Sequence, residues 1–370
     1  MKHPSVSAHS EDDSTPRPSS YSYFTSEIAS NPLVTSTHCL ATAWAQKYYI
    51  AVTERAQANA LREIPLAGAD SEEGRIRTAH NLLDNLSLAS AQAWSLTETL
   101  LSSEIRSHCI DPSLLKPLEI AADSRKLFKV ALEAYSQGIT PQQLSLLISR
   151  ATGEVRQKYT EKDPRIIGFV SMQFHYTGQK LLEWLTFSEK ALFEPYLKVM
   201  DDHMYMPLTA AYESAANHDY HSPALSSVQH LLPISTQIAH AVYGKVCQMH
   251  PGYKTYSGPL TAERVKISSI RDIEMFQVYL CLCTLEDGID AVKQELFPLC
   301  VMLYPPLKVD WVLVQDMLKL ISWEIMERLT PKDVVMLLPY LQTFIRMFSG
   351  NVFQAGSTAV DQAPARPSAA

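Results

Sequence analysis

The chain has 370 residues, of which 46% are hydrophobic and 19% charged, and it carries a formal net charge of -7 at pH 7. Its length allows one large or two ordinary domains with a sizeable core. The acidic balance argues against a general nucleic-acid-binding protein, which needs a basic face to neutralise phosphates. Charged residues fall below the usual share of about 25%, so either an unusually large part of the chain is buried or a partner covers part of its surface.

Glycine is scarce, with 12 residues, whereas proline reaches 22. All-β proteins use glycine in their turns, and helical proteins place proline at helix starts, so this balance favours helices. We therefore predict an all-α fold, in a compact protein of roughly ten to twelve helices. The 6 cysteines form no C-x-x-C pair, which is typical of reduced, mostly buried thiols in a cytoplasmic protein.

The polar composition of both ends predicts disordered tails at residues 1–30 and 351–370. Between the tails we expect an N-terminal helical domain over residues 31–160 and a C-terminal helical domain over residues 161–350. The boundary between them is placed at a charged run, Arg156 to Asp163.

The sequence predicts neither a secretory signal nor a membrane-spanning helix. Residues 1–30 lack the apolar region of a signal peptide. The most apolar segment, Leu296 to Val309, is shorter than the about 18 residues that a span needs, and it contains prolines. Peripheral association with a membrane stays open.

Signals for helix starts recur along the chain. Thr140, Thr186 and Thr330 each place a hydroxyl at an N-cap, with a side-chain acceptor three residues later. Proline follows Thr140 and Thr330 at the first helical position, where its missing N–H costs nothing. The same combination of cap and proline occurs at three further places: Asp111-Pro112, Asp163-Pro164 and Ser222-Pro223.

Apolar periodicity places helices between these signals. The expected helices are Pro32–Ile64, Thr78–Cys109, Leu114–Tyr135, Thr140–Tyr159, Leu225–Met249, Ser269–Leu285, Ile289–Tyr304, Val309–Arg328 and Pro331–Phe348. The helix that ends at Met249 should break or kink at Pro233. Turn residues from His250 to Pro259 predict the longest internal loop, and we expect a short extended piece at Val265 to Ile267.

A chemical site is expected in the segment from Arg165 to Pro223, where His, acidic, aromatic and Met residues are densest. Imidazole and carboxylate groups bind zinc, iron or manganese, and neighbouring helices can project them inward. The predicted metal ligands are His175, Asp202, His203, His218 and His221. His175 and His203 are also the predicted cofactor-binding residues, and the identity of any cofactor stays open.

The same residues allow a purely structural interpretation. The chain contains neither the Glu-x-x-His motif of di-iron bundles nor the HExxH motif of zinc proteases. Asp202 and His203 are adjacent, so on a helix they diverge by about 100° and clamp one ion poorly. In this interpretation Asp201 or Asp202 meets the backbone or Lys198, and His203 fills a half-buried position.

The segment allows two further interpretations. The stretch His218 to Pro223 is locally similar to a triad fragment, but no G-x-S-x-G elbow or Cys–His signature accompanies it, so we predict no catalytic residue. Aromatic and Met residues could line a pocket for a planar ligand such as a tetrapyrrole, with His175 or His203 as axial ligand. An ordinary packing stripe is the alternative, because three of these residues repeat at i, i+4 and i+8: Tyr196, Met200 and Met204.

A helix-turn-helix could begin at Gly138, where a short turn leads into a helix with basic residues. The residues that could meet phosphates are Arg150, Arg156, Lys158 and Lys162. Glu154 and Glu161 dilute this face, so a solvated helix end explains the pattern equally well. We do not expect a nucleic-acid partner.

The C-terminal third is rich in apolar and aromatic residues, in the segments VYLCLCTL, ELFPLCVMLYPPLKVDWVLV and VVMLLPYLQTFIRMF. A well-filled core explains this content, and so does an interaction patch. Because low charge also points to a covered surface, we predict a non-enzymatic intracellular regulator, adaptor or assembly protein that binds a protein partner through these helices. The alternatives are a metal- or planar-cofactor-binding protein or enzyme with a site around His175 and His203, and a DNA-binding regulator.

Overall fold

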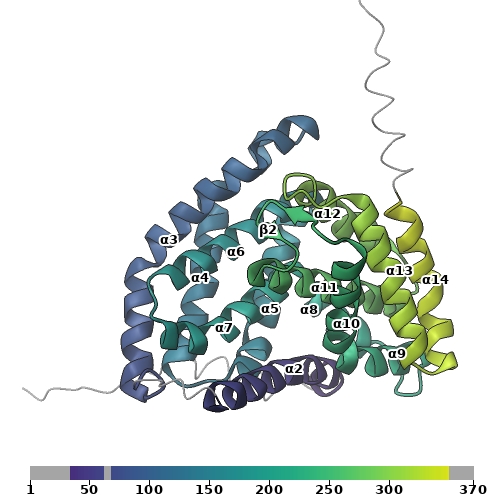
Figure 1. Ribbon diagram of the computed structural model, residues 1–370, viewed down its shortest axis with the longest axis horizontal. Coiled ribbons are helices and arrows are strands. Elements are labelled where there is room, and N and C mark those ends of the chain that lie inside the picture. The colour runs from purple at the N-terminus through teal and green to yellow at the C-terminus, as the bar shows by residue number, and fades with distance from the viewer. Residues whose placement is uncertain (1–33, 62–67, 350–370) are drawn as a thin grey trace, which may run out of the picture. The chain divides into compact units, whose positions relative to one another are not determined.

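The computed structural model describes residues 34–61 and 68–349 (Figure 1). The chain divides into two units, Met1–Thr35 and Ser36–Ala370, and the contacts discussed below all belong to the second unit. The predicted tails at residues 1–30 and 351–370 lie outside the described residues.

The fold is all-α, as predicted. The helices are α2 (Val34–Leu61), α3 (Glu72–Ser107), α4 (Pro117–Ser136), α5 (Pro141–Thr160), α6 (Ile167–Glu183), α7 (Phe187–Tyr205), α8 (Leu208–Ala216), α9 (Pro223–Leu231), α10 (Ser235–Met249), α11 (Glu263–Glu286), α12 (Phe297–Leu303), α13 (Trp311–Arg328) and α14 (Pro331–Met347). In the described part of the chain, strand structure is limited to β1 (Lys254–Thr255) and β2 (Gly258–Pro259). These two strands pair antiparallel within the predicted loop after α10.

The predicted helix starts are confirmed where threonine is the cap. Thr140 and Thr186 each form a complete capping box, with Gln143 and Glu189 respectively, and the Thr330 side chain accepts from the backbone N–H of Asp333. Asp111 and Asp163 also cap, but they begin 3₁₀ turns at Pro112–Leu114 and Pro164–Ile166 and not α-helices.

Two predicted elements differ in the structure. Val265 to Ile267 is not extended, because α11 begins at Glu263, directly after the β2 turn, and Val265 packs into the core. The helix expected over Ile289–Tyr304 is divided by a π-helical turn at Val292–Leu296 that precedes α12. Pro298 lacks the N–H that would continue an α-helical ladder, which explains a change of pitch just before it.

The expected break at Pro233 is confirmed. The 3₁₀ turn Leu232–Ile234 separates α9 from α10, so the predicted helix Leu225–Met249 becomes two helices. This break matters because α9 packs against α14, whereas α10 packs against α13. The two halves of one predicted helix therefore share α11 as a neighbour but differ in their second partner.

Helix α11 positions the candidate site. It packs against α7, α8, α9, α10 and α14, and it lies among the other C-terminal helices in Figure 1. From Ile270 to Leu285 every residue is buried except Asp272. A helix that is apolar on nearly all sides must be surrounded by other elements, so the few charged groups that it carries lie inside the protein.

Helices from both sides of the predicted domain boundary pack together. Helix α5, which begins before the charged run and ends inside it, contacts α7 and α8 after the run. Arg156 of α5 is buried, with its guanidinium 2.5 Å from the Glu295 carboxylate and 2.9 Å from the Tyr279 hydroxyl. The division into two helical domains stays a prediction.

Candidate functional site

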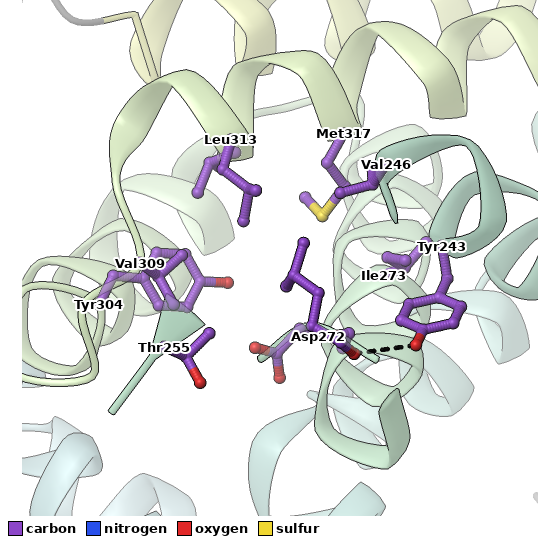
Figure 2. Close-up of a pocket in the computed structure, with 12 residues that line it drawn as sticks. Tyr243, Val246, Thr255, Asp272, Ile273, Tyr304, Val309, Leu313 and Met317 are labelled. Atoms are coloured by element: carbon purple, nitrogen blue, oxygen red, sulfur yellow. Dashed lines mark hydrogen bonds between the residues drawn. The ribbon is translucent and has the colours of Figure 1, made fainter. Parts of the chain in front are cut away.

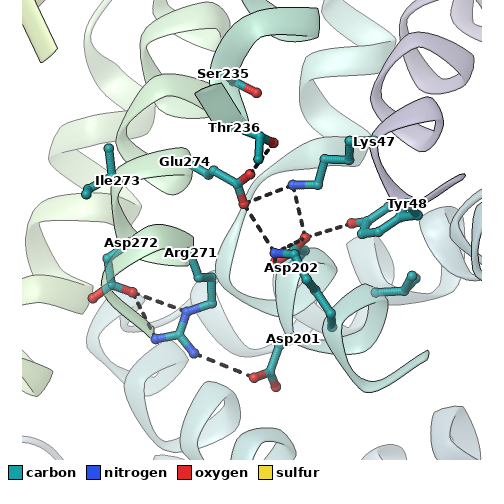
Figure 3. A network of polar contacts seen from close by, with 12 residues as sticks. Lys47, Tyr48, Asp201, Asp202, Ser235, Thr236, Arg271, Asp272, Ile273 and Glu274 are labelled. Atoms are coloured by element: carbon teal, nitrogen blue, oxygen red, sulfur yellow. Dashed lines mark hydrogen bonds and ion pairs between the residues drawn. The ribbon is translucent and has the colours of Figure 1, made fainter. Parts of the chain in front are cut away.

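Three charged residues interrupt the apolar run of α11 from Ile270 to Leu285, namely Arg271, Asp272 and Glu274. Side chains two positions apart on a helix point in nearly opposite directions, so Asp272 and Glu274 serve different surroundings. Glu274 is fully buried towards α2 and α7. Asp272 keeps partial exposure, with 23% of its side chain accessible. Helix α11 thus separates an inner network around Glu274 from an outer one around Asp272 (Figure 3).

The inner network holds two carboxylates between two ammonium groups. The Lys47 Nζ of α2 lies 3.1 Å from Asp202 and 3.0 Å from Glu274. The Lys198 Nζ lies 3.2 Å from each of the same two carboxylates. The Tyr48 hydroxyl donates to Asp202 over 2.9 Å. Every carboxylate therefore meets two cations, and α2 is tied to α7 and α11 by charge.

The charges of this inner network balance, with two positive and two negative groups. Burial opposes ionisation of Asp202, yet Lys198 and Lys47 hold the pKa of that carboxyl below its ordinary value. The same two lysines lower the pKa of Glu274, which also accepts from the Thr236 hydroxyl over 2.6 Å. Both carboxylates are therefore ionised at neutral pH. Since each of their contacts is to another structural residue, the inner network stabilises the fold and has no oxygen left for a ligand.

The outer network is a chain of polar contacts that ends at Asp272. The His175 Nδ1 lies 2.8 Å from Asp201, and the Arg271 Nη1 lies 3.6 Å from Asp201. Arg271 also stacks on Tyr205, with its guanidinium carbon 3.6 Å from the ring centroid. Its Nε and Nη2 donate to a single oxygen of Asp272, Oδ1, over 3.2 Å and 2.8 Å. The guanidinium thus bridges two carboxylates.

Asp272 borders a pocket between α10, α11 and α13 (Figure 2). The cavity has a volume of about 60 Å³, far below the about 300–1,000 Å³ of sites for drug-sized ligands. Its wall is mostly apolar and includes Val246, Leu313 and Met317. Hydroxyl-bearing residues also contribute, with Thr255 from β1 and Tyr304 from the segment after α12. This space fits a few heavy atoms, such as the end of one side chain.

The pKa of Asp272 is raised, whereas the pKa values of the inner carboxylates Asp202 and Glu274 are lowered. Burial raises the pKa of this carboxyl above its ordinary value, and the adjacent Arg271 offsets the effect only in part. In contrast, the pKa of Asp201 is lowered: burial opposes this, but the contact with His175 and the guanidinium of Arg271 outweigh it. Asp272 is therefore the least compensated carboxylate of the outer network. A carboxylate of this kind in a pocket is the type of group that functional sites contain.

The structure does not bring the predicted metal ligands together. His175 lies in the outer network and Asp202 in the inner one. His203 is buried, with its Nδ1 2.9 Å from the Val199 carbonyl and its Nε2 3.4 Å from the Ser145 hydroxyl. Burial lowers the pKa of His203 to about 4, so its imidazole is neutral at pH 7. Asp202 and His203 point into different surroundings, as the about 100° between adjacent helical residues requires.

His218 and His221 lie in the turn between α8 and α9. The His218 Nε2 donates to the Leu285 carbonyl over 2.6 Å, and its Nδ1 lies 2.8 Å from the hydroxyl of Ser222, the N-cap of α9. His221 is exposed, with its ring beside that of Tyr220. Within residues 34–61 and 68–349, no three His, Cys, Asp or Glu side chains form a group that could hold a metal ion. The metal and cofactor assignments stay predictions.

The Tyr and Met stripe and the basic residues of the possible helix-turn-helix make contacts within the protein itself. Tyr196, Met200 and Met204 are buried in the core, as expected for a packing stripe. Three of the four basic residues that could have met phosphates have partners within the protein. Arg156 is buried, Lys158 lies 2.7 Å from Asp123, and Arg150 lies 3.0 Å from Glu154. These cations are thus already engaged by groups of the protein itself.

Most of the apolar content in the C-terminal third forms core. The buried residues include Leu299, Cys300, Met302, Leu318, Ile321, Leu337, Leu341 and Phe344. A smaller set is exposed on α13 and α14, namely Val312, Trp323, Met326 and Val335. The Lys245 Nζ lies 3.2 Å from the centroid of the Trp323 ring, which holds that ring in place. The segments therefore supply both a core and an apolar remainder at the surface.

Sequence reasoning missed Lys47, Arg271, Asp272 and Glu274. The available signal was the presence of charged residues inside the apolar run from Ile270 to Leu285 and of a lysine among aromatic residues near Trp44. Charges that interrupt a buried face need partners, but the sequence does not say which.

Comparison with known proteins gave no match to this chain, whether with family models, with curated proteins or with solved structures. No helix in the described part of the chain combines the length and apolar character needed to cross a membrane. The functional argument therefore starts from the pocket and its surroundings.

Proposed function

We propose that this protein is a non-enzymatic cytoplasmic adaptor, regulator or assembly protein that binds a protein partner through its C-terminal helices. The pocket between α10, α11 and α13 is the centre of the binding surface. The observation that supports this proposal is the combination of a small open pocket with exposed apolar residues close to its lining residues in the chain.

Four apolar residues that are more than half exposed lie within three positions of a residue that lines the pocket. They are Met249 after Val246, Tyr256 after Thr255, Ile267 before Ser269, and Val312 before Leu313. Single exposed apolar residues are ordinary, but several in the segments that form one pocket favour an interface. In such interfaces an anchor side chain enters a pocket while the surrounding contacts exclude water.

The size of the pocket favours a protein over a free small molecule. A cavity of about 60 Å³ buries only a few atoms, which is too little area for tight binding of a compact ligand. A protein segment gains additional area outside the cavity, on exposed apolar residues of the segments that form the pocket. The net charge of -7 further favours a partner with a basic surface, because opposite charges accelerate association.

Site-specific cross-linking tests this proposal. A photoreactive amino acid in place of Tyr256 should capture a partner in an extract of the producing cells, and the additional change Val312→Asp should lower the yield by about tenfold. The control is Leu118→Asp, because Leu118 is 86% exposed and lies in the first turn of α4, away from the pocket-lining helices in the chain. Equal losses with Val312→Asp and Leu118→Asp would contradict the proposal. A product made of two copies of this chain would assign the surface to self-association instead.

A further inference from the structure

One oxygen of Asp272 has no hydrogen-bond donor among the described residues. Both bonds from Arg271 go to Oδ1, and the contacts within residues 34–61 and 68–349 include none to Oδ2. Figure 2 shows the Asp272 side chain in the wall of the pocket, with Thr255 and Tyr304 across from it. Because 23% of the Asp272 side chain is accessible, this oxygen can accept a donor from outside the protein.

The outer network supplies Asp272 with fewer cations than the inner network supplies to its carboxylates. Asp201 and Asp272 share the guanidinium of Arg271. Asp202 and Glu274, in contrast, each meet both Lys47 and Lys198. Asp272 is therefore paired with one cation through one oxygen.

The chemistry of the pocket selects an ammonium group over other cations. A guanidinium binds best to both oxygens of a carboxylate, but Arg271 already occupies Oδ1. An ammonium is a compact charge with three donors, and it needs only Oδ2 and neutral acceptors. Thr255 is such an acceptor, because its proton goes to the Gly258 carbonyl and its lone pairs stay free. The apolar wall, including Leu313 and Met317, suits the methylene groups behind the charge.

We propose that this pocket binds a primary ammonium group with an unbranched apolar stem, as carried by a lysine side chain of the partner. This inference rests on the proposed function for the source of the ammonium group, which is a partner protein. The preference for an ammonium group itself follows from Asp272 and its pocket. Acetylation of that lysine would abolish binding, because the amide has no charge and is larger.

Titration of the full chain with small probes tests the chemistry directly. The methyl NMR signal of Met317, assigned with Met317→Leu, should shift saturably with n-butylammonium or Nα-acetyl-lysine amide. n-Butanol and Nα,Nε-diacetyl-lysine amide should bind at least about tenfold more weakly, because a hydrogen bond to a charged group is lost. Equal shifts with butylammonium and butanol would overturn the proposal.

Two variants separate the carboxylate from the cavity. Asp272→Asn should weaken butylammonium binding by about tenfold or more, whereas Asp290→Asn, at a carboxylate that is 75% exposed, should leave it unchanged. Leu313→Trp fills the cavity and keeps Asp272, so it should also abolish binding of butylammonium. This variant provides the test if Asp272→Asn does not fold. Unchanged affinity in both Asp272→Asn and Leu313→Trp would refute the site.

The outcomes distinguish this inference from the proposed function. Cross-linking at position 256 without ammonium binding would retain a partner surface and remove the ammonium site. Selective ammonium binding without a cross-linked partner would remove the partner and assign the pocket to a free amine. Binding of the lysine amide that Nε-acetylation abolishes, together with cross-linking that Val312→Asp reduces, is the result that we expect.

Discussion

At the scale of single residues, the partners of a charge decide what it does. Glu274 and Asp272 are two positions apart on one helix, yet Glu274 contacts two lysines and Asp272 contacts one arginine through one oxygen. The lysines lower the pKa of Glu274, whereas burial raises that of Asp272. The Glu274 carboxylate therefore stabilises the fold, whereas one oxygen of Asp272 is available to a ligand.

Neutralising Glu274 should destabilise the protein strongly. Glu274→Gln keeps the shape and an acceptor for Thr236, but it leaves Lys47 and Lys198 with a single carboxylate, Asp202. Removing one partner from a buried ion pair typically costs about 3–5 kcal/mol, which urea unfolding measures at pH 7. Glu154→Gln is the matched control, because its pair with Arg150 is exposed and should matter by less than about 1 kcal/mol. Equal effects of the two changes would show that the inner network does not stabilise the fold.

At the scale of elements, α2 shows how a helix is attached by charge as well as by apolar packing. Trp44 and Tyr48, one turn apart, are buried, and Lys47 next to them reaches carboxylates on α7 and α11. The Lys47 ammonium also lies 3.5 Å from the centroid of the Trp44 ring. One short segment of α2 therefore makes the contacts that hold it.

Removal of the Lys47 charge should loosen α2 selectively. In Lys47→Met the apolar stem is kept, but Asp202 and Glu274 share only Lys198, so the cost of opening α2 falls. Hydrogen exchange should then accelerate by about tenfold or more in the amides of residues 44–54, with little change in α3. Lys158→Met is the control, since that lysine is 45% exposed on α5. Unchanged exchange in α2 would contradict the assigned role of Lys47.

At the scale of the whole molecule, the groups that should govern acid stability lie where α5, α7 and α11 meet. The His203 Nε2 lies beside Ser145 of α5, and Asp202 and Glu274 lie on α7 and α11. Because these groups are buried between helices that are distant in sequence, a change in their charge acts on global unfolding and not on one local segment.

Stability should fall in two steps as the pH decreases. Burial lowers the pKa of His203 to about 4, so between an unfolded value of about 6.5 and about 4 only the unfolded chain takes up this proton. That step amounts to about 3 kcal/mol. The pKa values of Asp202 and Glu274 are lowered, so their contribution is present above their unfolded values of about 4 and is lost as the pH falls further.

Urea unfolding at pH 7, 5.5 and 4.5 checks the first step. His203→Asn keeps a donor for the Val199 carbonyl but does not titrate, so the decrease in stability over this range should become smaller. His221→Asn, at an exposed position, should retain the decrease. The assignment to His203 fails if both variants show the same pH dependence.

The sequence by itself determined the fold class and many helix boundaries. Pro233 lies in the 3₁₀ turn between α9 and α10, whereas Pro195 and Pro339 lie inside α7 and α14, so proline alone did not determine where a helix breaks. The starts at Thr140, Thr186 and Thr330 depend on hydrogen bonds within four residues. Such signals are local and are complete in the sequence. The prediction of an extended piece at Val265 was wrong, because the preceding turn ends at Ala262 and α11 begins at the next residue, Glu263.

Only the tertiary structure decided which charges meet and where a cavity remains. Lys47 and Glu274 are 227 residues apart, and neither has a local pattern that names the other. The pocket requires α10, α11, α13 and the β1 segment at once, so no single stretch of the chain contains it. Helical periodicity determines which side of a helix is buried, but the packing of helices against one another determines the partner of each buried group. For that reason Asp272 lies at a pocket, whereas His175 and His218 of the His-rich segment lie in separate surroundings.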